Sequence, residues 1–456
     1  MDDSVVRSVS INFPGAYGLL PSQKYFDVAP GLVTFFDSSA STQAFRTAYG
    51  NSISNEAELK SFMAGQMDGR SEATTVNEAA FANSSMLDEA FLQHSSVLDN
   101  WVAPDGIEVI EVVGVGLNTV SGFQYTGFTE RVCEEPDVFG QQECKNKQIY
   151  KPKPFISEYG DQTVMGQSAE GYDGEKETYY VDLLEIVNER KSESVSHGDF
   201  TENPSIQQLL KNILEKATTT DIDFISQTQT TFDKDRVLLG VHSPVTMEVV
   251  DSEGRKVGVE YVSSEQLPQA IEEIPGSSYF EIGDSKYIVL PAELEYNVVL
   301  KGTGEGGLTF TLDTLEGELQ TPLISVAVAT ITASTTIKVS YDNEALSNLL
   351  IDTNNDGATD IEMTPSGEII PPTVTYDMLR NAVKTLSLSG VWKKPLQVLV
   401  TAAEAFDKRS RTNVKYTQLE VFTLNQLETT LKFYVQRKLL TYSQIEPILK
   451  IIKGLK

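Results

Sequence analysis

The 456-residue sequence predicts a multidomain protein in which an α/β region is followed by an antiparallel β-sandwich and a small all-α module. Three observations lead to this fold class. An almost wholly apolar run at 107–116 and an amphipathic run at 204–216 indicate a buried strand and a helix. Short β-rich runs recur between turns from 221 to 345, and helical periodicity fills 375–456. We therefore expect domains at 1–217, 218–370 and 371–456.

The first domain is expected to mix loops, helices and short strands. A polar, helix-rich insert at about 30–102 precedes the apolar strand. Gly114 and Gly116 mark the end of that strand, where α/β proteins place functional loops. The later helix begins with Asn203 as its N-cap and Pro204 at its first position. Its apolar stripe is formed by Ile206, Leu209, Leu210, Ile213 and Leu214.

The second and third domains differ in their patterns. Runs such as RVLLGVHS, TMEVVD and EYNVVLKG, separated by turn dipeptides, predict an Ig-like antiparallel β-sandwich over 218–370 that ends in an acidic turn. The Pro-marked IIPPTV predicts a stiff linker. The segment LSLSGVWKKPLQVLV and the helical runs after it predict three or four helices. This tail resembles the FIMAH-type helical domains of exported bacterial proteins.

Charge is distributed unevenly along the chain. The formal net charge of −29 argues against a nucleic-acid-binding protein, because phosphate neutralisation needs clustered Lys and Arg. Residues 371–456 hold 14 of the 36 Lys and Arg but only 6 of the 65 Asp and Glu. This segment therefore carries +8, and the remainder, with 22 against 59, carries −37. The basic segment predicts either solvated helix faces or contact with an acidic cell surface or membrane surface.

Signs of export come from the cysteines alone. No run reaches the roughly 18–20 apolar residues of a bilayer-spanning helix, and residues 1–15 lack the pattern of a signal peptide. Cys133 and Cys144 lie in a polar stretch, and an even count there favours one local disulfide in a secreted or cell-surface protein. Two free thiols are the alternative. No further cysteine and no histidine lies near the pair, which argues against zinc.

One of the three histidines lies where a catalytic base is expected. His94, in the helix-rich insert, and His242, beside a turn of the β-rich region, fit structural roles. His197 lies in VSHGDFTENP, a loop fixed by the start of the capped helix. Asp161 precedes it by 36 residues, which is the order of the acid and the base in the triad of α/β-hydrolases. In such a triad the aspartate orients the imidazole that takes the serine proton.

Four segments around these residues resemble the lecithin:cholesterol acyltransferase-like lipases. They are FPGAYGLLPSQKYF (13–26), FLQHSSVLDNW (91–101), EYGDQTVMGQSAE (158–170) and HGDFTENPSIQQLLKNIL (197–214). The resemblance spans roughly residues 5–216 and implies part of an α/β-hydrolase fold, a lid-like helical insert and an ester or lipid substrate. It also implies that Asp161 is the triad acid and His197 the general base, with no cofactor required. Gln162 departs from the family, which has glycine there.

The nucleophile of such a triad is missing. The sequence contains no Gly-x-Ser-x-Gly and no HGGG-type oxyanion loop. Without a serine and oxyanion donors, the Asp–His pair has nothing to activate, so this chain alone is expected to be inactive. We expect the C-terminal part of a secreted bacterial lipase or acyltransferase, with the upstream half supplied in cis or by a second chain. A non-catalytic surface-binding or adhesion protein, using the sandwich and the helical tail, is the alternative interpretation.

The acidic turn IDTNNDGATDIE is a candidate calcium site. Gly357 fits position 6 of a calcium-loop pattern, whereas Met363 stands at position 12, where a bidentate glutamate is usual. Positions 1, 3, 5 and 9 are held by Asp352, Asn354, Asp356 and Asp360. A turn rich in Asx residues explains the same string without a metal.

Overall fold

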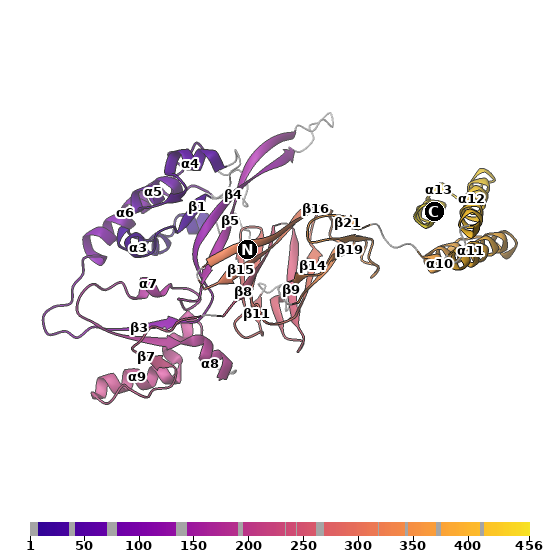
Figure 1. Ribbon diagram of the computed structural model, residues 1–456. Coiled ribbons are helices and arrows are strands. Elements are labelled where there is room, and N and C mark those ends of the chain that lie inside the picture. The colour runs from indigo at the N-terminus through magenta and orange to yellow at the C-terminus, as the bar shows by residue number, and fades with distance from the viewer. Residues whose placement is uncertain are drawn as a thin grey trace. The chain divides into compact units, whose positions relative to one another are not determined.

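The chain forms two compact units in a computed structural model (Figure 1). One unit comprises 1–357 with 364–367, and the other comprises 358–363 with 368–456. The structure describes residues 8–35, 42–70, 80–133, 144–189, 195–232, 234–242, 244–260, 269–317, 319–342, 345–370, 375–410 and 415–456, without the side chains of 127–149. Within these ranges, no helix combines the length and the apolar character that crossing a membrane requires.

A mixed sheet carries the N-terminal part of the first unit. Its order is β2-β1-β4-β5, in which β1 and β4 are parallel and the other neighbours are antiparallel. Its strands are β1 (Val33–Phe35), β2 (Ser52–Ile53), β4 (Thr119–Cys133) and β5 (Cys144–Ser157). The helices are α2 (Pro14–Tyr17), α3 (Gln23–Val28), α4 (Gln43–Tyr49), α5 (Glu56–Met63), α6 (Ser84–Gln93) and the π-helix η2 (His94–Leu98). The five α-helices contribute to an aromatic core with Val33 and Phe35, in which the ring centroids of Phe35 and Phe45 lie 5.0 Å apart.

The β4–β5 hairpin is longer than the sequence predicted. Its strands have 15 and 14 residues, whereas only short strands were expected here. β5 is the edge strand of its sheet and contains Pro152 and Pro154 together with Lys151 and Lys153. Proline and lysine are typical of edge strands because they discourage further pairing. In a single sequence the same residues indicate a loop, which explains the wrong prediction.

A second sheet in the same unit has the order β3-β6-β7. β3 (Ile110–Val115) and β6 (Glu177–Asp182) are parallel, and β7 (Ile225–Ser226) is antiparallel to β6. The short helix α7 (Gly166–Ala169) precedes β6, and the helices after it are α8 (Leu183–Glu189), the 3₁₀-helix η3 (His197–Glu202) and α9 (Pro204–Glu215). Val181, Leu183, Ile186 and Ile206 form one core cluster, while Val113, Val115 and Tyr159 form another.

The predicted strand and capped helix are both present. β3 lies inside the predicted range 107–116, and the side chain of Asn203 accepts a hydrogen bond from Ser205 N at 3.0 Å as the N-cap of α9. The apolar stripe is narrower than predicted. Ile206 and Leu209 are buried, but Leu210 and Leu214 are exposed because the helix packs on the sheet through its first turns.

Two antiparallel sheets complete the first unit and confirm the predicted antiparallel character of this region. One has the order β12-β13-β8-β15-β16, and the other contains β11-β10-β9-β14-β17-β19, with β18 beside β17. Their strands are β8 (Arg236–His242), β9 (Val245–Asp251), β10 (Lys256–Glu260), β11 (Gln269–Glu272), β12 (Ser278–Ile282), β13 (Ser285–Pro291), β14 (Tyr296–Gly302), β15 (Gly306–Glu316), β16 (Leu319–Ile331), β17 (Thr336–Asp342), β18 (Ala345–Leu346) and β19 (Leu349–Asp352). The Tyr296 hydroxyl on β14 donates to the carbonyl of Pro291 on β13 at 2.7 Å, which joins the two sheets.

The second unit is mainly helical, as predicted. A small hairpin of β20 (Ile361–Met363) and β21 (Ile369–Ile370) precedes its helices. The helices are α10 (Tyr376–Thr385), α11 (Gly390–Ser410), α12 (Lys415–Gln436) and α13 (Tyr442–Leu455). They enclose a core of their own whose buried members all lie between Tyr376 and Ile452.

Candidate functional site

The structure brings Asp161 and His197 into direct contact. Oδ2 of Asp161 lies 2.7 Å from Nδ1 of His197. The aspartate side chain is 10% exposed and the histidine side chain 49%. Nε2 of His197 has no hydrogen-bond partner in the described part of the chain. A nearly buried carboxylate therefore holds one edge of an imidazole whose other nitrogen is open.

The pair lies beyond the carboxyl ends of two parallel strands. β3 leads through the long hairpin to Asp161, and β6 leads through α8 to His197. After the hairpin the chain returns to the end of β3, where Gly116 N donates to Glu158 O at 2.7 Å and Leu117 N donates to Gly160 O at 3.1 Å. Because the carboxyl ends of parallel strands share one edge of a sheet, the two loops meet there.

The loop after Asp161 orients the carboxylate. Oδ1 accepts hydrogen bonds from Thr163 N at 3.1 Å and Val164 N at 2.7 Å, which leaves Oδ2 for His197. Gln162 has φ +76°, a left-handed backbone conformation that glycine adopts with less strain than other residues do. Its N–H donates to Thr119 Oγ1 at 2.9 Å, which fixes the turn. The loop thus closes around the aspartate although it lacks a glycine at 162.

Two glycines allow the chain to pack closely around the pair. A Cβ added to Gly160 would lie 2.5 Å from Thr119 Oγ1 and 2.8 Å from Val164 O. A Cβ added to Gly114 on β3 would lie 2.8 Å from the Phe200 ring and 3.0 Å from Cβ of Asp161. Gly160 therefore requires glycine, because backbone is among the atoms it would meet, whereas a side chain at Gly114 would displace the Phe200 ring. The Gly-Asp sequence at 160–161 is the local signal of this packing.

The geometry fixes the tautomer of a neutral His197. A carboxylate only accepts hydrogen bonds, so Nδ1 carries the proton and Nε2 keeps its lone pair. Nε2 can therefore take a proton from a nucleophile, while Asp161 stabilises the imidazolium that results. The first turn of η3 is held by the Ser196 hydroxyl, which donates to Asp199 Oδ2 at 2.9 Å.

A cavity of about 280 Å³ lies beside the pair. Gln162, the neighbour of Asp161, and Val195, two residues before His197, both line it. Glu272 of β11 also lines it and accepts a hydrogen bond from Gln162 Nε2 at 3.0 Å. No local sequence pattern connects Glu272 with a loop 110 residues earlier, so its position could not be predicted. Neither Asp161 nor His197 lines it, and its lining combines apolar side chains such as Leu184 with the charged side chains of Arg255 and Glu273.

The other two histidines have structural surroundings. The ring Nε2 of His94 lies 3.1 Å from Gly18 O, and Nδ1 lies 3.7 Å from Asp99 Oδ1. His242 on β8 packs edge-on against the Tyr287 ring, with Nδ1 2.8 Å from Ser285 Oγ. Burial lowers the pKa of His242 to about 4.

The acidic turn is organised by its own backbone. Asp352 Oδ2 accepts from Gly357 N at 2.8 Å, and Asn354 Oδ1 accepts from Asp356 N at 2.9 Å. Burial raises the pKa of Asp352, but hydrogen bonds from backbone N–H groups outweigh it, so this pKa lies below its usual value. No group of three or more His, Cys, Asp or Glu residues suited to a metal occurs among the described residues. Calcium on Asp352, Asn354, Asp356 and Asp360 stays a prediction, which calorimetric titration of wild type and Asp356→Ala tests.

The two cysteines occupy facing positions at the tip of the β4–β5 hairpin. The strand register pairs Cys133 with Cys144. Their side chains lie outside the described residues, so the disulfide stays a prediction.

Comparison of the chain with protein-family models, curated proteins and solved structures gave no match.

Proposed function

We propose that this chain supplies the acid and the general base of a serine-hydrolase centre, within a partial α/β-hydrolase fold that acts on ester or lipid substrates. The observation that carries the proposal is the 2.7 Å contact between Asp161 Oδ2 and His197 Nδ1 at the ends of parallel strands, with Nε2 open. The resemblance of both loops to lecithin:cholesterol acyltransferase-like lipases supports these roles.

The nucleophile comes, in this proposal, from a further segment that pairs with the open edge of β3. Within the described residues, β3 has β6 as its only neighbouring strand. Val109 O accepts from Glu177 N at 3.0 Å on the β6 side. Because alternate residues of a strand bond in opposite directions, Val112, Gly114 and Gly116 direct their backbone groups away from β6. Glu158 O already accepts from Gly116 N at 2.7 Å, so the part of this edge that a further strand could pair with lies at Val112 and Gly114. A strand of the upstream half, in cis or as a second chain, fits there and brings a serine toward Nε2 of His197.

Ester hydrolysis tests this function. Turnover of p-nitrophenyl butyrate and palmitate is measured for this chain alone and for its assembly with the nucleophile-bearing segment. The chain alone is expected to show none. The assembly is expected to be active, and His197→Ala is expected to lower kcat by about 10⁴-fold or more. His94→Gln is the matched control, because His94 lies outside the pair. Turnover by this chain alone, or activity that survives His197→Ala, would contradict the proposal.

A non-catalytic role at a bacterial cell surface is the second candidate, and the helical unit favours it. Residues 371–456 carry +8, and Trp392 and Phe422 are exposed on α11 and α12. Cationic surfaces with exposed aromatic residues favour anionic membranes. Sedimentation of 371–456 with phosphatidylglycerol vesicles, and with phosphatidylcholine vesicles as the control, tests this role. Equal binding to both kinds of vesicle, or binding to neither, would contradict this role.

A further inference from the structure

Arg236 begins β8, the central strand of one antiparallel sheet, and its side chain is 3% exposed. β8 pairs with β13 on one side and with β15 on the other, so the backbone of Arg236 is held from both sides. Nη1 donates to Asn118 Oδ1 at 2.5 Å, and Nη2 donates to Gly317 O at 3.4 Å. Nε lies 3.3 Å from Glu158 Oε2, so the two side chains form a buried ion pair. One guanidinium therefore contacts two separate segments that precede the antiparallel sheets.

These two segments hold the loop of Asp161. Both chain neighbours of Asn118 are hydrogen-bonded to the residues that flank Asp161. These bonds join Leu117 N to Gly160 O at 3.1 Å and Gln162 N to Thr119 Oγ1 at 2.9 Å. Glu158 stands three residues before Asp161, and its carbonyl accepts from Gly116 N at 2.7 Å. Arg236 thus restrains the aspartate through both segments at once.

The amide of Asn118 extends this contact to the start of β12. Its Nδ2 donates to Gly276 O at 2.8 Å and to Ser278 Oγ at 3.2 Å, while its Oδ1 accepts from Arg236. The residue is 4% exposed. Because both ends of the amide are bonded, Asn118 has one orientation, and the residue after β3 is fixed to the antiparallel sheet.

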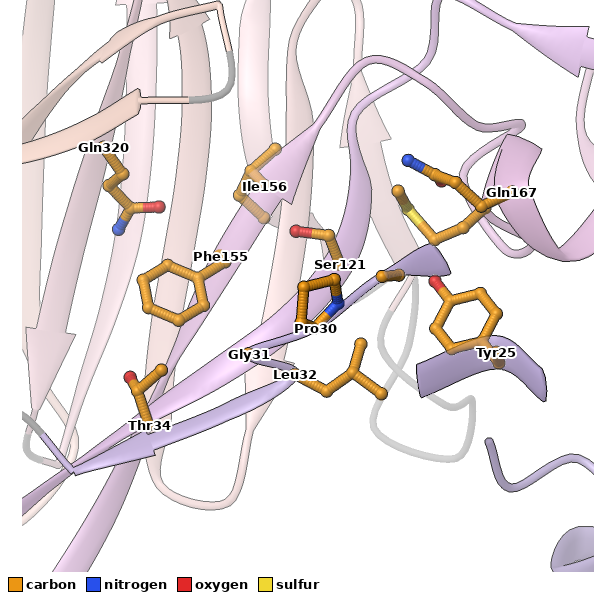
Figure 2. A pocket seen from close by; sticks show the side chains of 12 residues that line it. Tyr25, Pro30, Gly31, Leu32, Thr34, Ser121, Phe155, Ile156, Gln167 and Gln320 are labelled. Atoms are coloured by element: carbon orange, nitrogen blue, oxygen red, sulfur yellow. The ribbon is translucent and has the colours of Figure 1, made fainter. Parts of the chain in front are cut away.

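The β4–β5 hairpin before the loop packs on the same sheet. Ile156 on β5 lies in one core cluster with Leu238 on β8. Gln320 on β16 donates from Nε2 to Pro154 O on β5 at 3.2 Å. Figure 2 shows Ile156 on the hairpin and Gln320 on β16, which both line a cavity of about 350 Å³. The sheet therefore supports the end of the hairpin, and Arg236 connects this support with the loop.

Arginine suits this place better than lysine. A guanidinium is planar and presents its N–H groups in fixed directions, so Arg236 faces Asn118 and Glu158 at the same time. A lysine ammonium is a point charge on a flexible stem and does not hold two partners at fixed angles. The geometry of the guanidinium, and not its charge alone, therefore sets the register between the two segments.

We propose that Arg236 is a positioning residue for the Asp161–His197 pair. By holding Asn118 and Glu158, it keeps the loop where Asp161 Oδ2 lies 2.7 Å from His197 Nδ1. This proposal rests on the proposed function only for the catalytic roles of the pair. It makes the antiparallel sheet of β8 a part of the centre and not a separable appendage.

Proton and nitrogen-15 NMR of His197 in the full chain tests this role, with the signals assigned by their loss in His197→Gln. The bond to Asp161 protects the Nδ1 proton from water. In Arg236→Lys the loop is expected to open more often, so this proton is expected to exchange about tenfold faster or more.

Arg70→Lys is the matched control. Arg70 also forms an ion pair, in which Nε lies 2.9 Å from Asp68 Oδ1, but its guanidinium lies over the Phe62 ring of the aromatic core. Because effects at separate sites are independent, Arg70→Lys is expected to change the exchange rate of the His197 proton by less than about twofold.

A neutral double variant separates positioning from folding. Arg236→Met with Glu158→Gln leaves no unpaired charge of the former ion pair, and such replacements often preserve stability. This variant is therefore expected to keep the melting temperature of the wild type while its His197 proton exchanges faster. The proposal is overturned if both Arg236 variants show the exchange rate of the wild type, or if Arg70→Lys raises that rate equally. The NMR measurement needs no nucleophile, so failure of this proposal and failure of the hydrolase function are distinguishable.

Discussion

The two carboxylate oxygens of Asp161 have separate roles. Oδ1 is occupied by the backbone N–H groups of Thr163 and Val164, and Oδ2 contacts Nδ1 of His197. The backbone donors set the plane of the carboxylate, so the direction of the imidazole follows from the shape of the loop. A turn of four residues thereby decides which nitrogen of His197 is open.

Asp161→Asn is expected to reverse the tautomer of His197. The amide oxygen of asparagine can still accept from Thr163 N and Val164 N, which turns its NH₂ group toward Nδ1. A donor in that place requires Nδ1 to accept, so the proton moves to Nε2. Nitrogen-15 NMR of the imidazole measures this change, with His94→Gln and His242→Gln used to assign the signals. An unchanged tautomer in Asp161→Asn would refute this account of the loop.

His242 is expected to make the stability of the first unit depend on pH. Its pKa is lowered to about 4, first by burial and then by Lys151 and Lys153, against an opposing effect of Asp284. An unfolded histidine titrates near 6.5, so below that pH the unfolded chain gains a proton that the folded chain does not. Lowering the pH from 7 to 5 is therefore expected to lower the free energy of unfolding by about 2 kcal/mol.

Urea unfolding at the two pH values measures this cost. In a Trp392→Phe background, Trp101 becomes the single tryptophan and reports on the first unit. His242→Gln is expected to remove this part of the pH dependence, whatever its own effect on stability. The assignment fails if wild type and variant lose equal stability between pH 7 and pH 5.

At the scale of elements, local signals predicted some structures and missed others. The sequence around Asn203 and Pro204 was enough to predict the start of α9, and the apolar run was enough to predict β3. Both predictions succeed because helix caps and buried strands have local sequence patterns. Asp161 and His197 could be singled out for the same reason, since each lies in a turn beside such an element. The contact between Asn118 and Arg236 could not be predicted, because the two residues are 118 positions apart.

The open edge of β3 is expected to be visible in hydrogen exchange. By strand alternation, Val113 and Val115 direct their N–H groups to β6, whereas Val112 and Gly114 direct theirs to the open edge. The amides of Val112 and Gly114 are therefore expected to exchange about 100-fold faster or more, since an unpaired amide needs no opening of the strand. Amide exchange followed by NMR measures this contrast. Equal protection of all four amides would show that another segment already covers this edge.

At the level of the whole molecule, the contacts inside one unit differ in kind from the contacts inside the other. The first unit combines four sheets whose neighbours come from distant parts of the chain, and β1 pairs with β4 across 90 residues. Such order cannot be derived from periodicity, which reports only on nearby residues. The helical unit instead contacts residues close in sequence, and its four helices follow the predicted pattern.

The helical unit is therefore expected to fold alone. All buried members of its core lie between Tyr376 and Ile452, so residues 371–456 retain the whole core when separated from the rest. Leu427 is 1% exposed, so Leu427→Ala is expected to lower the free energy of unfolding by about 2–5 kcal/mol. Leu419→Ala is the control, because Leu419 is 36% exposed on the same helix and should cost less than about 1 kcal/mol. Urea unfolding of 371–456 followed by circular dichroism measures both. A fragment without a cooperative transition, or equal costs for the two leucines, would mean that the helices depend on another part of the chain.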